Sequence, residues 1–219
     1  MAGSPVRFSA HDRRQQIMQV ATELFARQGF EGTTTRQVAE QARVNEALIF
    51  RHFPHKEDLY WAIIEDKCQT AGRRAELQRK LQANGNDREA FAAIAEDILR
   101  RRMKDTTLTR LLFFSALENH RLAYRFFRTH VAEYYEVLAD HIRKRIRDGG
   151  FRRVDPLLAA RGFLGMVIYH ILIQELFGGK RYQKFDLRRV SGTLADIWLQ
   201  GMRARSGRGS PFEKPSRRR

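Results

Sequence analysis

Between residues 34 and 56 the chain carries polar side chains of the types that bind nucleic acid. These are Thr34, Thr35, Arg36, Asn45, His52 and Lys56. An arginine can donate two hydrogen bonds to the edge of one guanine, and lysine, histidine and threonine can donate to backbone phosphates. Each of these side chains could also be an ordinary solvent-exposed residue, so their meaning depends on the elements that carry them.

The pattern of residues 33–54 predicts two short helices joined by a tight turn. Consecutive threonines supply N-cap oxygens for a helix over 36–42, and Asn45 can cap a second helix over 46–53 that Pro54 ends. The apolar residues that face inward are Val38, Ala39, Ala42, Ile49 and Phe53. Because the second helix has little apolar surface on its outer side, it is free to lie against another molecule. This layout is a helix-turn-helix, whose second helix enters the DNA major groove.

The stretch from about residue 10 to 68 resembles the DNA-binding domain of the tetracycline-repressor (TetR) family. The matching motif residues are Thr34-Thr35-Arg36, Val38-Ala39, Val44-Asn45, Ile49-Phe50-Arg51-His52-Phe53 and Lys56-Glu57-Asp58-Leu59. The preceding helix matches at Ile17, Val20, Ala21, Leu24 and Phe25, followed by Gly29-Phe30-Glu31-Gly32-Thr33. Beyond residue 68 the likeness is confined to chain length and helical pattern.

The resemblance implies an all-α fold, with an N-terminal three-helix helix-turn-helix domain and a C-terminal helical domain for ligand binding and dimerisation. We expect these domains at 10–70 and 71–205, with a disordered basic tail at 206–219. Periodicity predicts helices over 10–28, 55–82, 88–104, 107–119, 122–147, 156–177 and 187–203. Asp87 is expected to cap one of them, and Gly178-Gly179 to form only a turn.

The resemblance also implies which residues contact DNA. They are Thr34, Thr35, Arg36, Asn45, Glu46, Ala47, Leu48, Phe50, His52 and Lys56. Arg36 is the strongest candidate for a base contact, and His52 and Lys56 are candidates for phosphate contacts. Phe50 stands where the family often has a tyrosine that touches phosphate. A phenyl ring cannot donate that bond, so we expect it to pack on a sugar or on neighbouring side chains.

Three positions depart from the family's usual pattern. Arg43 occupies a turn position where glycine is common, which costs about 1 kcal/mol if φ is positive there. Glu46 places an acid at the front of the recognition helix, where it repels phosphate and favours the amino group of a cytosine. Leu48 replaces a frequent threonine, although leucine can pack on a thymine methyl. These departures affect the choice of operator sequence rather than the fold.

The formal net charge of the 219-residue chain is +16. Residues 1–68 hold nine basic and nine acidic side chains, so the whole excess lies in residues 69–219, with 32 basic and 16 acidic side chains. The net charge of the whole chain is therefore not evidence that residues 1–68 bind DNA, and that prediction depends on the motif alone. The basic C-terminal half leaves open a second function, sequence-independent binding of polyanions by an architectural protein.

Several classes of protein are disfavoured. The single cysteine, Cys68, excludes an internal disulfide, the N-terminal residues lack the apolar run of a signal peptide, and the longest apolar stretch, 162–173, is too short to span a bilayer. We therefore expect a cytoplasmic protein with no membrane partner. No metal, cofactor or catalytic site is expected, because His52 and His55 straddle Pro54 and no acid–base or nucleophile cluster is apparent.

The C-terminal half is rich in apolar residues at helical spacing, most of which are expected in the core. The family resemblance nevertheless implies a small-molecule pocket. Its candidate residues are Phe113, Phe114, Leu117, Tyr134, Phe163, Met166 and His170. The sequence thus favours a repressor that forms a homodimer through its last two long helices, binds a palindromic operator and is relieved by a small apolar effector. An activator, or a regulator without a ligand, would use the same DNA site.

Overall fold

The computed structural model describes residues 9–68, 72–82, 86–118 and 120–204. The helices in these ranges are α1 (Ala10–Gln28), α2 (Thr35–Ala42), α3 (Glu46–His52), α4 (Lys56–Cys68), α5 (Arg73–Gln82), α6 (Asp87–Lys104), α7 (Thr107–Glu118), α8 (His120–Phe126), η1 (Phe127–Val131), α9 (Ala132–Arg147), α10 (Pro156–Ile171), η2 (Leu172–Leu176), α11 (Gly179–Tyr182) and α12 (Leu187–Met202). The extended pairing recorded within these ranges is one isolated bridge, between Phe151 and Arg203. The predicted all-α fold is confirmed, and the predicted tail at 206–219 lies outside the described residues.

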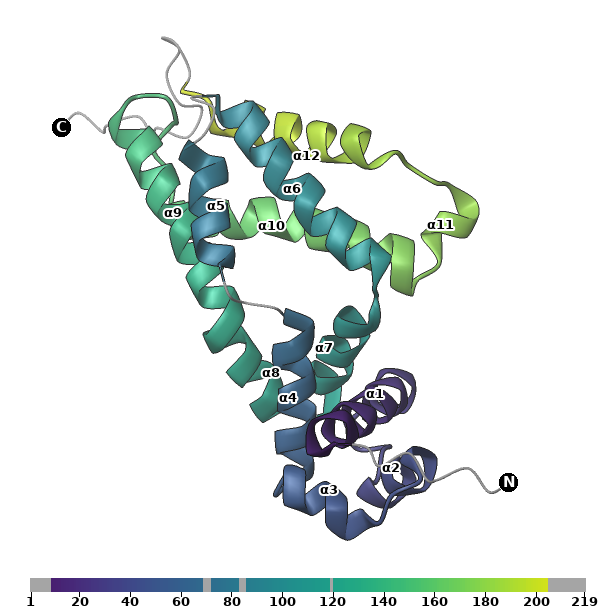
Figure 1. Cartoon of the computed structure of the whole chain (residues 1–219). Coiled ribbons are helices and arrows are strands. Elements are labelled where there is room, and N and C mark those ends of the chain that lie inside the picture. Colours follow the sequence, from purple (N-terminus) through teal and green to yellow (C-terminus); the bar gives the residue numbers. More distant parts are fainter. Residues whose placement is uncertain (1–8, 69–71, 83–85, 119, 205–219) are drawn as a thin grey trace, which may run out of the picture.

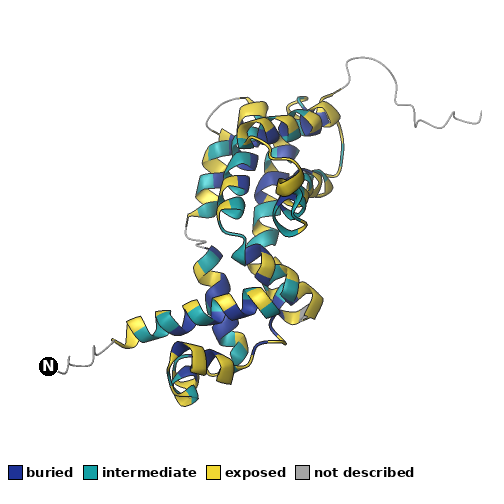
Figure 2. Ribbon diagram, turned by 90° about the vertical axis from the view of Figure 1, so that its right-hand side faces the viewer, coloured by how far each residue is buried: buried dark blue, intermediate teal, exposed yellow. Residues whose placement is uncertain are grey.

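The helices pack around two hydrophobic cores, one in each half of the molecule (Figure 1). The first core joins α1–α4 with α7 and α8, whose Leu111 and Leu122 are buried in it. The second joins α5, α6, α9, α10 and α12 around the rings of Phe91, Phe163 and Trp198, whose centroids lie 4.3 to 5.5 Å apart. Figure 2 shows buried residues in the interior of both halves. The first core therefore includes helices beyond the predicted boundary at residue 70.

Side-chain caps explain where helices begin. The Thr34 hydroxyl accepts from the backbone N–H of Gln37 at 3.1 Å, and the Gln37 side chain accepts from the Thr34 N–H at 3.0 Å. This reciprocal capping box starts α2 at the predicted position. The prediction that Asp87 caps α6 is wrong, because the N-cap residue is Asn86. Asp87 instead accepts hydrogen bonds from two basic side chains of α9, and this tertiary contact has no local sequence signal.

Three departures from the predicted helices have backbone causes. The helix expected over 55–82 is divided, because Gly72 before α5 has a φ of +84°, a conformation that an α-helix does not contain. The helices expected over 122–147 and 156–177 contain the π-helical turns η1 and η2. Gly178, with a φ of +75°, starts the short helix α11 where only a turn was expected. Hydrophobic periodicity does not report such local changes of hydrogen bonding.

The helical run formed by α10 and η2 is apolar on its exposed face as well as on its buried face. Pro156–Leu176 has the length and composition of a membrane span, contrary to the sequence prediction, although a core helix of a soluble protein passes the same test. One side of the run packs on α6, α9 and α12. Its other side exposes Leu158 and Tyr169, each with 64% of its surface accessible. One face of this helix therefore builds the second core, while the opposite face leaves apolar surface uncovered.

The conformation of Arg43 generates a prediction about stability. Arg43 ends α2 with φ 51° and ψ 47°, and it is the sole non-glycine residue with positive φ in the described ranges. Since glycine adopts this conformation without a Cβ clash, Arg43→Gly should raise the free energy of unfolding by about 0.5–1 kcal/mol. Urea unfolding followed by circular dichroism measures the change. The control Arg27→Gly, in the last turn of α1, should instead lower the stability.

Candidate nucleic-acid interface

The turn between α2 and α3 is held by caps and by one contact from α1. Asn45 Oδ1 accepts from the backbone N–H of Ala47 at 2.8 Å and caps α3, as predicted. The Gln16 side chain of α1 donates to the carbonyl of Ala42 at 2.9 Å. Because a backbone carbonyl at the end of α2 is satisfied by α1, the two short helices are fixed to the longer one.

The predicted contact residues lie on the outside of the molecule, around α2 and α3, at the end furthest from α12 (Figure 1). The exposed members of the set are Thr34, Arg36, Asn45, Ala47 and Phe50. The half-buried members are Thr35, Glu46, Leu48, His52 and Lys56. The inward residues Val38 and Ile49 are almost fully buried, so the sequence separates the two sides of the motif correctly.

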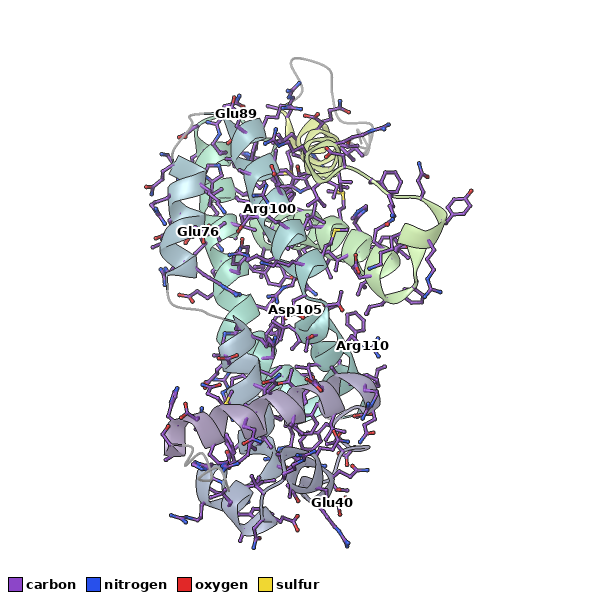
Figure 3. All side chains as sticks on the ribbon, turned by 45° about the vertical axis from the view of Figure 1, so that its right-hand side comes forward. Glu40, Glu76, Glu89, Arg100, Asp105 and Arg110 are labelled. Atoms are coloured by element: carbon purple, nitrogen blue, oxygen red, sulfur yellow. The ribbon has the colours of Figure 1, made fainter. Side chains whose placement is uncertain are left out.

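The Arg36 side chain projects into solvent with 81% of its surface exposed. Its Nε lies 3.0 Å from Glu40 Oε1, one helical turn further along α2. Figure 3 shows Glu40 at the lower end of the molecule. An exposed pair of this kind contributes at most about 1 kcal/mol, so another acceptor can replace Glu40 at little cost.

The structure shows the surroundings of Glu46 and Phe50, two residues that differ from those common in the family. The Thr35 hydroxyl donates to Glu46 Oε1 at 2.5 Å, so this acid joins the start of α2 to the start of α3. The phenyl ring of Phe50 is 45% exposed and does not belong to the first core. Its apolar surface is available to solvent, and the expected packing on a sugar or on neighbouring side chains stays a prediction.

Lys56 is partly used inside the protein. Its Nζ donates to the carbonyls of Phe30 at 2.9 Å and Thr33 at 3.0 Å, and it lies 4.1 Å from the centre of the Phe30 ring. An ammonium group has three protons, so one remains for another acceptor. Lys56 therefore supports the loop between α1 and α2, and its predicted contact with phosphate stays a prediction.

Glu118, at the end of α7, holds the same loop from the other side. Its Oε2 accepts from the backbone N–H groups of Phe30 at 2.7 Å and Glu31 at 3.2 Å. Gly29 has a φ of +81°, and a Cβ added there would lie 2.1 Å from Glu118 Oε1. A side chain at position 29 would therefore strain the backbone and displace the Glu118 carboxylate. Because Glu118 and Phe30 are 88 residues apart, no spacing in the sequence reveals this contact.

Two further hydrogen bonds attach α7 to the N-terminal helices. Arg110 Nε donates to the carbonyl of Ala26 near the end of α1 at 2.7 Å, and the Tyr60 hydroxyl of α4 donates to the carbonyl of Leu111 at 2.5 Å. Figure 3 shows Arg110 close to the narrow middle of the molecule. These contacts fix α7 to α1 and α4, so α7 is one of the elements that join the helix-turn-helix to the rest of the chain.

The structure does not bring the seven predicted effector residues into one cavity. Phe163 is buried in the second core, Leu117 is 83% exposed on α7, and the His170 ring lies 5.8 Å from the Phe185 ring. Phe113 is also exposed and Phe114 is half-buried. The effector role of this set stays a prediction, because helical spacing identifies residues on one face of a helix but not the faces that meet.

Tyr134 and Met166 do line hollows, but separate ones. Tyr134 lines a cavity of about 290 Å³ between α5 and the η1–α9 segment. Met166 lines an open groove of about 630 Å³ between α10 and α12, together with Ile197 and Trp198. Within the described part of the chain, no three His, Cys, Asp or Glu side chains are grouped so that they could hold a metal ion.

Family models match both halves of the chain. A model described as bacterial regulatory proteins of the tetR family matches residues 17–63, which include the helix-turn-helix. A model of the C-terminal domain of AefR-like transcriptional repressors matches residues 89–199, about half of the chain.

Individual relatives agree with these models. The nucleoid occlusion factor SlmA of Vibrio campbellii is 29% identical over 175 residues, 76% of this chain and 84% of that protein. NalD of Pseudomonas aeruginosa, the secondary repressor of the MexAB-OprM multidrug efflux pump, superposes with a TM-score of 0.68 at 17% identity, over 89% of this chain and 98% of that one. The regulator FadR of Bacillus subtilis, in complex with stearoyl-CoA, superposes with a TM-score of 0.65 at 20% identity, over 85% of this chain and 98% of that one. At these identities the two structures establish the fold.

The contact between Glu118 and the loop generates a second prediction. Glu118→Gln keeps the shape but removes the charge from two hydrogen bonds, so the free energy of unfolding should fall by about 1–2 kcal/mol. Exchange of the Phe30 and Glu31 amide protons should accelerate, which NMR can follow residue by residue. The exposed Glu23→Gln of α1 is the matched control and should change neither quantity. Unchanged exchange at both amides would show that the carboxylate does not hold them.

Proposed function

Because this chain belongs to the TetR family, whose members are DNA-binding regulators of transcription and not enzymes, we propose that it is a homodimeric repressor that releases its operator when a small ligand binds. The observation that carries the proposal is the outward face of α2 and α3, where polar side chains lie around a short exposed helix. A helix of this size fits the DNA major groove, and Arg36 is placed to reach base edges or phosphates beside it.

The exposed apolar face of α10 and α12 supports a dimer. Leu158 of α10 and Ile197 of α12 are 64% and 55% exposed, and the groove between the two helices is lined mostly by apolar atoms and small residues such as Gly162 and Gly201. Contiguous apolar surface of this kind usually marks an interface. A two-fold axis that runs through this face along the long direction of the molecule would place two helix-turn-helix motifs at one end of the dimer, and the operator would then be palindromic.

Ligand control is supported by the architecture between the two cores. The second half of the chain contains a cavity beside η1 and α9, and α7 attaches this half to the loop that precedes α2. A ligand that prefers one arrangement of these helices would change the spacing of the two motifs. Because DNA offers half-sites at a fixed pitch, a changed spacing would weaken operator binding. The FadR complex with stearoyl-CoA supports a ligand with an apolar part.

A second candidate function is sequence-independent DNA binding, favoured by the basic surplus in residues 69–219. The ratio of affinities for one DNA site and for random DNA at physiological salt separates the two functions. A specific regulator should bind its site about 10³-fold more tightly than random DNA. Footprinting of the DNA upstream of the protein's own coding region is the experiment that supplies the site. Equal affinity for all DNA would overturn the repressor and support the architectural protein.

Once an operator is in hand, Arg36→Ala is expected to weaken its binding by about 1–3 kcal/mol and to relax one base position, because it removes a bidentate donor. Fluorescence anisotropy on the operator and on single-base variants measures both effects. Arg100→Ala is the matched control: Arg100 is also an exposed arginine paired with a glutamate one helical turn away, but it lies on α6. Parental affinity of the Arg36 variant would remove Arg36 from the DNA-contacting set.

The proposed dimer is tested by Ile197→Glu. A charge placed in an apolar interface should weaken association by several kcal/mol, so light scattering at micromolar concentration should show monomer where the parent shows dimer. The control Leu117→Glu alters an even more exposed residue on α7, away from α10 and α12, and should leave the dimer intact. A monomeric parent protein would sink the proposed interface.

A further inference from the structure

The cavity between α5 and the η1–α9 segment has the chemistry of an anion site. We propose that the ligand of this regulator carries a carboxylate or phosphate group that binds there, to Arg73, His130 and Tyr134. This inference rests on the proposed function and specifies the chemical class of the effector.

The cavity has a volume of about 290 Å³ and brings together residues far apart in the chain. Arg73 and Leu77 line it from α5, and His130 and Tyr134 line it from the opposite wall. His130 lies in η1, where the wider π-helical turn interrupts the regular α-helix. Such turns occur often at functional sites, because they change the direction of side chains without ending the helix.

Arg73, which lines the cavity, and its neighbour Arg102 form no direct ion pair with the acidic side chains of the described ranges. Both are half-buried, and they interact electrostatically with each other. Burial lowers the pKa of both guanidinium groups, but arginine remains protonated in proteins. Two like charges held together away from bulk water are unfavourable, so an anion beside them would be stabilised.

The acidic side chains nearby are already paired with other groups. Glu133, which also lines the cavity, lies 2.8 Å from Arg74 Nη1. Asp97 pairs with Lys80 and with Arg101. Three other acids lie nearby: Glu65 accepts from the Trp61 indole, and Asp105 accepts from Lys67. Glu76, which acts on Tyr134, pairs with Lys80. The charge of Arg73 is therefore left for a group that enters from outside.

Two neutral donors complete the site. Both ring nitrogens of His130 are buried and without a hydrogen-bond partner. Burial and then the charge of Arg73 lower the pKa of the His130 imidazole, so the ring is neutral at pH 7 and offers one N–H. Burial raises the pKa of the Tyr134 hydroxyl, which therefore remains a donor. A guanidinium, an imidazole N–H and a phenol match the acceptor oxygens of a carboxylate or a phosphate.

The site also touches the helix that leads to the DNA-binding motif. The His130 ring stacks on Trp61 of α4, with centroids 5.7 Å apart and planes inclined by 19°. Trp61 belongs to the first core, and α4 begins at Lys56, which holds the loop before α2. A hydrogen bond that changes the position of the His130 ring would therefore act on Trp61 of α4 through this stacking contact.

The test uses the full-length protein and the eight-carbon probes octanoate, octyl phosphate and neutral 1-octanol in isothermal titration calorimetry. At least one anion should bind at least about tenfold more tightly than 1-octanol, and the two anions distinguish a carboxylate from a phosphate ligand. Arg73→Gln should remove this preference, and Arg73→Lys, which keeps the charge, should restore part of it. Arg79→Gln, an exposed arginine of the same helix, is the matched control. Circular dichroism verifies that each variant is folded.

Three results overturn the anion site: no binding of either anion at about 1 mM, 1-octanol bound as tightly as both anions, or parental affinity in folded Arg73→Gln. Operator binding in the same samples separates this inference from the proposed function. An anion bound through Arg73 that leaves operator affinity unchanged overturns ligand-relieved repression but keeps the site. Operator release by an anion that Arg73→Gln does not weaken overturns the site but keeps the repression.

Discussion

The placement of α2 depends on how the backbone between α1 and α2 is held. Glu118 of α7 accepts from two N–H groups of this loop, while Lys56 of α4 donates to two of its carbonyls. Hydrogen bonds to charged groups contribute about 1.5–3 kcal/mol each, and an unpartnered backbone group in a partly buried loop costs about 1–3 kcal/mol. One short segment thus joins three helices, so a displacement of α4 or α7 changes the direction in which Thr34 and Arg36 point.

Local chemistry explains which parts of the fold could be predicted from the sequence. The starts of α2 and α3 depend on Thr34 and Asn45, whose bonding partners lie two or three residues away, and apolar spacing placed Ile49 inside and Arg36 outside. Glu118 could not be found in this way, because its partners belong to another part of the chain. The candidate effector residues are scattered over the described structure for a related reason. Spacing within a helix groups residues on one face, and only tertiary packing decides which faces enclose a space.

The two cores do not divide the chain at the end of the motif. Residues of α7 and α8 complete the first core, whereas α6, which precedes them, belongs to the second. The chain therefore crosses between the halves several times, and each crossing joins the cores by a short covalent path. Lys67 of α4 and Asp105 after α6 form an ion pair of 2.8 Å where two of these crossings meet. A molecule connected in this way transmits movement more readily than two domains joined by a single flexible linker.

The order of these cores along the chain has a consequence for folding during synthesis. The first core is complete in sequence once Leu122 has left the ribosome, so the helix-turn-helix half can fold before the second core exists. The second core must wait for Trp198 and Met202, near the end of α12. During that interval the part of the apolar run Pro156–Leu176 that packs on α12 in the finished protein has no α12 to cover it. The nascent chain is thus most prone to aggregation late in translation, after its DNA-binding half has already formed.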